Sequence, residues 1–193
     1  MADRVESGGI GELIDRVARA TRSLQFVDGL SPAQWEALRY VSRANHYSRH
    51  PSALAEFLGT TKGTVSQTLI ALEGKGYLRR ERGESDRRAV RLEITPAGRD
   101  LLRHDPLSHI DEAVADVMSE TDRSALAMGL GRLLRDLQRR TGANAFGVCL
   151  KCGLHIPAGA NGDPDAPQYC GLTGEALAGG EERCICVSFR SGA

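Results

Sequence analysis

The chain has 193 residues, of which 41% are hydrophobic and 26% are charged, and its formal net charge is zero. This length can form one sizeable core, or one core with a small appendage. Only 5% of the residues are aromatic, which argues against stacking platforms for single-stranded nucleic acid. The lack of a long apolar run and of a secretory signal predicts a cytoplasmic protein with no membrane partner.

The first part of the chain predicts helices. Apolar residues at helical spacing indicate a helix that begins near Ile10 and weakens towards Leu24. Ser31 and Pro32 provide an N-cap and a first-turn proline for a second helix. The buried stripe of this second helix is expected to contain Trp35, Leu38 and Val41.

Two shorter helices follow. After a loop over residues 46–51, Ser52 is expected to cap a helix that Gly59 ends. The next helix begins at residues 60–61 and closes at the glycines within residues 74–76. Its inward face is expected to hold Val65, Leu69, Ile70 and Leu72.

A β-hairpin comes next. Apolar and polar residues alternate in a way that predicts strands over residues 77–81 and 89–94, joined by a turn at 83–86. The second strand is expected to turn one set of side chains inward, namely Val90, Leu92 and Ile94.

Two further helices are expected after the hairpin. Thr95 and Pro96 start the first, which we expect to reach Val117 with a bend at Pro106. The second runs over residues 121–140. It is predicted to bury Leu126, Leu130, Leu133, Leu134 and Leu137.

The helix over residues 61–75 is polar on the side opposite its apolar face. Short hydroxyl and amide side chains can reach base edges or phosphates, and a helix N-terminus attracts phosphate. This face would therefore fit into a major groove. The candidate DNA contacts on this helix are Thr61, Lys62, Thr64, Ser66, Gln67 and Thr68.

The hairpin is rich in arginine, with six arginines against three acidic residues between positions 79 and 91. Arginine suits the narrow minor groove, where the negative potential is concentrated. Arg82, Arg87 and Arg88 are therefore the candidate DNA contacts of the hairpin. Taken singly, the polar helix could be a solvated face and the hairpin a solubility device, but in this order they favour binding of duplex DNA.

Residues 30–99 resemble the winged helix-turn-helix of MarR-type transcriptional regulators. Three strings carry the resemblance: LSPAQWEALRYV at 30–41, TKGTVSQTLIALEGKGYLRR at 61–80 and DRRAVRLEITPAGR at 86–99. The third string is the most distinctive, because it resembles the wing strand and its exit into the following helix.

The resemblance covers roughly residues 10–141 and implies a mainly α fold with a small β-hairpin wing (α+β) and flanking dimerisation helices. It also implies a homodimer that binds a pseudo-palindromic operator in double-stranded DNA and usually represses transcription, with Arg87 or Arg88 at the wing tip. Members of this family commonly respond to small molecules, metals or oxidants. The expected organisation is a winged-helix DNA-binding and dimerisation domain over residues 1–141 and a cysteine-rich metal-binding extension over 142–193.

Nothing in the sequence indicates an enzyme. There is no nucleophile elbow, phosphate loop or pair of carboxylates, and the histidines are scattered. Four thiolates on one metal would also leave no open coordination position for a substrate. We therefore expect no catalytic residues, and a metal-carrying protein-interaction module is the alternative to a DNA-binding regulator.

All five cysteines lie in the extension. Cys149 and Cys152 form a C-x2-C knuckle, and Cys170, Cys184 and Cys186 follow. Clustered thiols in a cytoplasmic chain point to metal ligation. A glycine-rich segment with few large apolar residues would also gain stability from a metal cross-link.

Four of these cysteines are the predicted ligands, namely Cys149, Cys152, Cys170 and Cys186. Cys186 is preferred to Cys184 because Ile185 and Val187 flank it like a short strand. Cys184 is the alternative fourth ligand, and His155 could replace one of the thiols.

The cysteine spacing fits more than one metal group. Structural zinc sites commonly use two close pairs of ligands, whereas three separate anchor points equally suit an iron–sulfur cluster. We favour the cluster, because it would give a regulator a response to redox state, iron or nitric oxide. The alternatives are a structural zinc clip, with a small molecule as the sensed ligand, and free redox-active thiols.

The position of the extension suggests how it would act on DNA binding. It follows directly on the helix over residues 121–140, which the resemblance places at the dimer interface. A change at the cysteines would then shift the separation of the two recognition helices.

Overall fold

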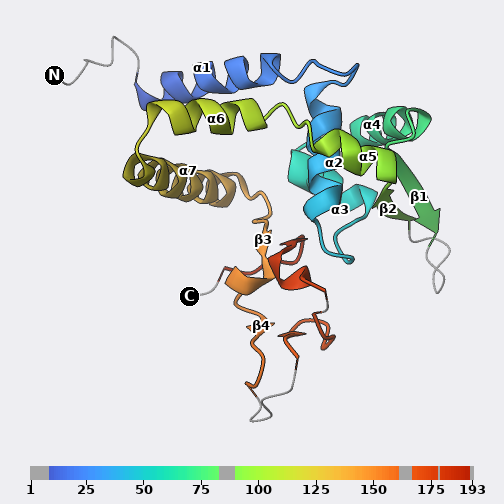
Figure 1. The fold of residues 1–193 in the computed structure, drawn as a ribbon. Coiled ribbons are helices and arrows are strands. Elements are labelled where there is room, and N and C mark those ends of the chain that lie inside the picture. The colour runs from blue at the N-terminus through green and yellow to red at the C-terminus, as the bar shows by residue number, and fades with distance from the viewer. Residues whose placement is uncertain (1–8, 83–89, 161–166, 178, 192–193) are drawn as a thin grey trace.

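The structure is a computed structural model that describes residues 9–82, 90–160, 167–177 and 179–191. Figure 1 shows α1, α6 and α7 on one side of the molecule and α2 to α5 with the first two strands on the other. The cysteine-rich extension, residues 142–193, is called the tail below, and it lies beneath α2 and α3 in this view. The predicted mainly helical fold with a hairpin wing is confirmed.

The first two helices lie where the sequence predicts them. Helix α1 spans Ile10–Ser23 and α2 spans Pro32–Arg43. Ser31 caps α2 in a complete capping box, because its hydroxyl accepts from the Gln34 N–H while the Gln34 side chain accepts from the Ser31 N–H. Trp35 is fully buried at the centre of the core.

The start of α3 differs from the prediction. Helix α3 spans Pro51–Leu58, and its N-cap is His50 rather than Ser52. The imidazole Nδ1 of His50 accepts from the Ala53 N–H at 3.1 Å, which is possible only when that nitrogen carries no proton. Burial lowers the pKa of His50 and so favours this neutral form. The sequence pattern missed this cap because histidine is not among the usual N-cap residues.

Helix α4 spans Lys62–Gly74 and packs its apolar side on α2 and α3. Its buried residues are Val65, Leu69 and Leu72. Ile70, which was predicted to face inward, is 52% exposed. The reason is the helical period of 3.6 residues, which turns position 70 away from the face that residues 65, 69 and 72 share.

The two strands of the wing form an antiparallel ribbon. Strand β1 spans Leu78–Arg82 and β2 spans Val90–Ile94, with Leu78 opposite Ile94 and Arg82 opposite Val90. Leu92 is fully buried in the core. The predicted turn at 83–86 lies outside the described residues.

The predicted single helix after the wing is instead two helices. Helix α5 spans Pro96–Leu102 and α6 spans Ser108–Val117. Pro106 lies in the break between them; it has no N–H to donate, and its ring disfavours a helical conformation of the preceding residue. The expected bend is therefore a complete interruption.

Helix α7 spans Glu120–Thr141 and is capped by Ser119. None of its described residues is buried in the single chain, although its leucines were predicted to be. Leu134 is 58% exposed and Leu137 49% exposed, and Ile10 and Val17 on α1 are equally uncovered. The apolar stripes of these helices are therefore present, but the described residues of a single chain leave them largely uncovered.

The tail forms two small antiparallel sheets. Strand β3 (Gly147–Val148) pairs with β6 (Ile185–Cys186), and β4 (His155–Ile156) pairs with β5 (Tyr169–Cys170). Two short 3-10 helices complete it, η1 (Cys149–Lys151) and η2 (Glu181–Arg183).

The tail is attached to the core of the helical part. Phe146 packs edge-on against Tyr40 of α2 and Phe57 of α3, with ring centroids 6.4 Å and 5.1 Å away. Ile185 and Val187 also pack against this core. The division at residue 141 thus separates two segments that share a packed interface. In the part of the chain that the structure describes, no helix is long and apolar enough to cross a membrane.

We predict that Gly98→Ala destabilises the protein by about 1–3 kcal/mol. A Cβ on Gly98 would overlap the Tyr77 carbonyl oxygen, so the packing of α5 against the residue that precedes β1 would have to shift. The free energy of unfolding, measured with urea, checks this.

Gly74→Ala is the matched control. A Cβ on Gly74, the last residue of α4, meets no atom within 4 Å. This substitution should be neutral or stabilising by up to about 1 kcal/mol. Equal effects at the two positions would show that the Gly98 contact does not determine stability.

Candidate nucleic-acid interface and cysteine site

The N-terminal half of α4 presents a polar face to solvent. Thr61, Lys62, Thr64, Ser66 and Gln67 are exposed. Thr68, the sixth residue predicted on this helix, is half-buried, and its hydroxyl donates to the Thr64 carbonyl of the same helix at 3.1 Å.

The threonines at the start of α4 fix the helix end. The Thr61 hydroxyl accepts from the Thr64 N–H at 3.1 Å, and the two hydroxyls are 3.0 Å apart. These hydroxyls therefore serve the helix cap, while Lys62, Ser66 and Gln67 have exposed side chains suited to a ligand. The remaining N–H groups of the first turn point out of the helix end, where they favour an anion such as a phosphate.

The described arginines of the wing are held by glutamates. Arg80 contacts Glu73 at 3.1 Å, and Arg91 contacts Glu93 at 2.8 Å. These pairs brace the wing against α4 and within β2. The predicted contacts Arg87 and Arg88 lie outside the described residues, and Arg82 is placed only as the last residue of β1.

The four predicted metal ligands surround one small cavity. The lining includes the side chains of Cys149, Cys152, Cys170 and Cys186, and the volume is about 20 Å³, close to that of one water-sized group. Leu154, Leu172 and Leu177 add an apolar wall. All five cysteines of the chain are free thiols.

Separate segments of the tail bring these four cysteines together. Cys149 directly follows β3, and Cys186 ends β6, where it pairs with Gly147. The Cys152 N–H donates to the Cys149 carbonyl at 2.9 Å, which closes the C-x2-C turn. Cys170 comes from the other sheet, opposite His155. Backbone pairing thus positions residues that lie up to 37 positions apart in the sequence.

Burial and hydrogen bonding give the thiols different acidities. Burial and the nearby Cys186 raise the pKa of Cys149 to about 11. At Cys170 burial also raises the pKa, but the backbone N–H groups of Thr173 and Leu172 outweigh it, so the pKa of that thiol lies below its ordinary value. Donors aimed at a sulfur stabilise a thiolate, as they do around metal-bound cysteines.

The glycine after the C-x2-C knuckle does not donate to a cysteine sulfur. The Gly153 N–H donates to the Arg190 carbonyl at 2.8 Å, and it is the Arg190 N–H that donates to the Cys152 sulfur at 3.4 Å. The segment that follows β6, not the knuckle itself, therefore provides this contact.

The donor set at the cavity suits a thiophilic metal, because sulfur ligands select zinc or iron–sulfur groups. Within the described residues, no three His, Cys, Asp or Glu side chains are yet arranged as ligands of a single ion. Binding would therefore require the thiol side chains to turn into the cavity.

The two alternative ligands occupy different places. Cys184 does not line the cavity, and its sulfur donates instead to the Gly180 carbonyl at 3.8 Å. His155 does line it, with its Nε2 2.7 Å from the side-chain oxygen of Gln168. The cavity therefore combines four cysteines with one histidine that already has a partner.

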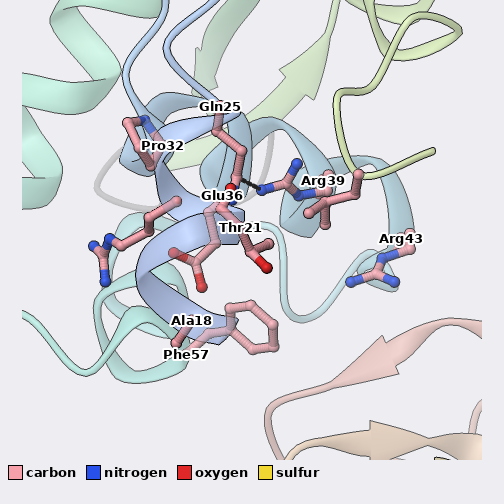
Figure 2. A pocket seen from close by; sticks show the side chains of 10 residues that line it. Ala18, Thr21, Gln25, Pro32, Glu36, Arg39, Arg43 and Phe57 are labelled. Carbon is pink, nitrogen blue, oxygen red and sulfur yellow. Dashed lines mark hydrogen bonds between the residues drawn. The ribbon is translucent and has the colours of Figure 1, made fainter. Parts of the chain in front are cut away.

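A second, larger cavity lies where α1 meets α2 (Figure 2). Its volume is about 420 Å³, within the range of small-molecule sites. Figure 2 shows Arg39 joined to Gln25 across this space, and the same guanidinium pairs with Asp105 at 2.7 Å. No sequence pattern indicates this cavity, because its residues come from segments far apart in the chain. They include Ala18, Arg22, Pro32, Arg43, Phe57 and Leu107.

The chain is similar to known DNA-binding regulators. A family model described as "MarR family" matches residues 28–89. The transcriptional repressor MprA of Escherichia coli (strain K12) is 25% identical over 113 residues, which is 58% of this chain. The match spans 64% of the length of that repressor.

Solved structures show the same architecture. The Streptococcus pneumoniae FabT structure in complex with DNA is 28% identical and superposes with a TM-score of 0.52, over 67% of this chain and 92% of FabT. The Staphylococcus aureus MepR–DNA complex, at 18% identity, shares the fold with a TM-score of 0.59, over 67% of this chain and 99% of MepR. In each case about a third of this chain is left uncovered.

Proposed function

We propose that this chain, which is similar to MarR-type winged-helix regulators, acts as a homodimer on a pseudo-palindromic operator and represses transcription. We further propose that the four-cysteine cavity holds a metal centre that modulates DNA binding. The observation that carries the first proposal is the exposed polar half of α4, set beside a wing that is braced by ion pairs.

The exposed polar half of α4 has the chemistry that duplex DNA requires. Lys62 and the N-terminus of α4 offer positive charge to phosphates, while Gln67 and Ser66 offer donors and acceptors to base edges. The buried residues of α4 anchor the helix in the core and so keep its polar face turned to solvent. The helix therefore needs little further ordering when it binds DNA. The arginines expected at the wing tip would add contacts in the neighbouring minor groove.

The uncovered apolar stripes of α1 and α7 support a dimer. Several large apolar side chains of these helices are about half exposed, an arrangement that water disfavours. A second copy of the chain could cover them and would place two α4 helices on one duplex. Such a pair matches the two half-sites of a pseudo-palindrome, which lie one helical turn apart.

Four thiols around one cavity support the metal centre. Buried neutral thiols next to apolar residues give the tail little stabilisation, whereas thiolates on a cation would cross-link its two small sheets. When bound, such a centre would supply a redox-responsive or structural cross-link. Cys149, Cys152, Cys170 and Cys186 would hold it, with the donors at Arg190, Thr173 and Leu172 stabilising the thiolates.

The cavity in Figure 2 favours a second candidate, regulation by a small organic anion. Phe57 and Leu107 offer apolar surface, and Arg22 and Arg43 offer positive charge near the joint between α1 and α2. In this version the four-cysteine centre is a structural zinc clip, and the effector acts from the cavity between α1 and α2.

We predict that Lys62→Ala weakens binding to DNA and lowers the slope of log Kd against log salt by about one, because one phosphate contact is lost. Gln67→Ala should relax the preference for one base pair at a cost of about 1–3 kcal/mol. The probe is a duplex selected by the wild-type protein from a random library, with binding followed by fluorescence anisotropy across a salt series.

Lys75→Ala is the control for this experiment. Lys75 follows the opposite end of α4 and donates to the Gly29 carbonyl, so its loss should leave the salt slope unchanged. Selected duplexes should contain inverted half-sites. Selection of no common sequence would reject the operator, and a salt slope unaffected by Lys62→Ala would reject the placement of α4.

We predict that Cys186→Ser weakens zinc binding by at least about 100-fold, because one of four thiolates is lost. Cys184→Ser should change the affinity by less than about twofold, since this sulfur lies outside the cavity. Competition with a chromophoric chelator measures both values. If Cys184→Ser weakens zinc binding much more than Cys186→Ser does, the fourth ligand is Cys184 instead.

Anaerobic purification of the same proteins, with metal analysis and an absorption spectrum, identifies the native centre. Visible charge-transfer bands together with iron indicate an iron–sulfur cluster, and a colourless protein with one zinc indicates a clip. Wild-type protein that holds neither metal, and takes up none, would remove the metal centre and leave the DNA-binding proposal standing.

For the second candidate we predict that benzoate raises the melting temperature of the wild-type protein. Ligand at about 100 times its Kd should contribute about 2.7 kcal/mol to stability. Arg43→Ala should abolish the shift, whereas Arg140→Ala, at the far end of α7, should retain it. A shift that survives Arg43→Ala would show that benzoate binds elsewhere.

A further inference from the structure

One short segment lies between the cysteine cavity and two elements next to α4, namely helix α3 and wing strand β2. Residues 44–49, here called the bridging loop, connect α2 to the His50 cap of α3. Three of its residues, Ala44, Asn45 and Ser48, are 0–2% exposed, which is unusual for a connecting loop. The tail contacts all three of these residues.

The tail side of the bridging loop is bonded to β6 and to the cysteine cavity. The Asn45 N–H donates to the Ile185 carbonyl at 2.9 Å, and the Val187 N–H donates to the Ser48 hydroxyl at 2.9 Å. These two bonds lie on either side of Cys186. The side chain of Asn45 donates from Nδ2 to the sulfur of Cys149, at 3.9 Å.

The other side of the bridging loop contacts α2 and the wing strand β2, and the α2 residue that it contacts packs on α3. The Tyr40 hydroxyl donates to the Ser48 carbonyl at 2.8 Å, and the Tyr40 ring packs on Phe57 of α3. The Leu92 N–H of β2 donates to the Arg49 carbonyl at 2.7 Å. Arg49 also pairs with Glu93 of the wing at 3.4 Å. The loop thus holds α3 and β2 at the same time.

Asn45 is the residue that joins these two sets of contacts. It is 2% exposed, and its Oδ1 accepts from the Ser48 N–H at 3.0 Å while its Nδ2 faces Cys149. An amide that donates to a thiolate forms a charge-assisted bond, which is much stronger than a bond to a neutral thiol. A buried N–H that loses its acceptor is costly to keep in place.

We propose that Asn45 is a positioning residue through which the four-cysteine site sets the placement of α3 and β2, and thereby DNA affinity; the proposal rests on the proposed metal centre. With metal on the thiolates, the Cys149 thiolate accepts a hydrogen bond from Asn45 and keeps the bridging loop ordered. Helix α3 and strand β2 are then already in the positions that DNA binding requires. Without metal the neutral Cys149 thiol is a weaker acceptor for Asn45, so the bridging loop is held less firmly and DNA binding must order it. Loaded protein therefore binds DNA more tightly than metal-free protein.

This route differs from the one expected from sequence, in which the tail acts through α7. Among the described residues, no hydrogen bond or salt bridge joins residues 147–191 to α7. Their polar contacts with the helical part instead go to the bridging loop, including His46 with Glu181 at 2.5 Å. The tail follows α7 in sequence but is attached elsewhere in space.

The test compares DNA affinity with and without Zn²⁺ in the full chain. For the wild type we expect the metal-free protein to bind the selected duplex about tenfold more weakly than the zinc-loaded one, a typical coupling between sites. Asn45→Ala should reduce this ratio to within about twofold while the protein still binds one zinc. Zinc content is measured on the same samples.

Asn144→Ala is the matched control. Asn144 also links the tail to α3, through Glu56 at 2.5 Å, but it does not contact a cysteine sulfur. This variant should keep the tenfold ratio. The proposal would be overturned if Asn45→Ala binds zinc and still shows the tenfold difference in DNA affinity between its zinc-loaded and metal-free forms. Equal DNA affinities of the zinc-loaded and metal-free wild type would also overturn it. Wild type that binds no zinc would instead reject the metal centre on which the proposal rests.

Hydrogen exchange on the wild type tests the same idea without a substitution. Zinc should slow exchange in peptides that cover residues 44–58 and leave the α7 peptides unchanged. Protection confined to α7 would overturn the proposal. This measurement keeps the proposal testable if Asn45→Ala fails to fold.

Discussion

The arrangement of the molecule depends on the hydrogen bonds of one fully buried serine. The Ser48 hydroxyl accepts from the Val187 N–H of the tail, and the Ser48 carbonyl accepts from the Tyr40 hydroxyl of α2. Its own N–H donates to Asn45. Each of these groups would be costly to bury alone. The tail must therefore be in place for the connection before α3 to have this shape, which makes an appended segment part of the DNA-reading unit.

Much of the helical part could be predicted because local chemistry determines it. Ser31 before Pro32 and Thr95 before Pro96 mark helix starts that need no tertiary contact, and both lie where expected. The failures have tertiary causes. His50 serves as the cap because its partly buried imidazole lies within hydrogen-bond distance of the Ala53 N–H, and burial lowers the pKa of this imidazole. Ile70 faces solvent because the buried face of α4 takes only residues 65, 69 and 72. The leucines of α7 show the limit of periodicity, which identifies an apolar face but not what covers it.

At the cysteine site the sequence pattern indicated the candidate ligands but not the residues that contact them. Spacing and composition were enough to select four thiols, and the structure places those four around one cavity with Cys184 outside it. Neither the role of Asn45 nor the donor at Arg190 could be read from a pattern, because each comes from a segment distant in sequence. Contacts of this kind follow from how β3 pairs with β6, and short strands of two residues carry almost no sequence signal.

Two properties of a dimeric regulator would then be governed by separate parts of this chain. The apolar stripes on α1 and α7 would determine how far apart the α4 helices of the two protomers lie. The bridging loop would determine how firmly α3 and β2 of each protomer are ordered. Because the tail is bonded to its own α2–α3 connection, a change at the cysteines can act within one protomer without altering the dimer geometry. Such a change would alter affinity through ordering of the loop and leave the spacing of the preferred half-sites unchanged. A mechanism acting through α7 would instead change the preferred spacing, so the two mechanisms differ in what they do to sequence preference.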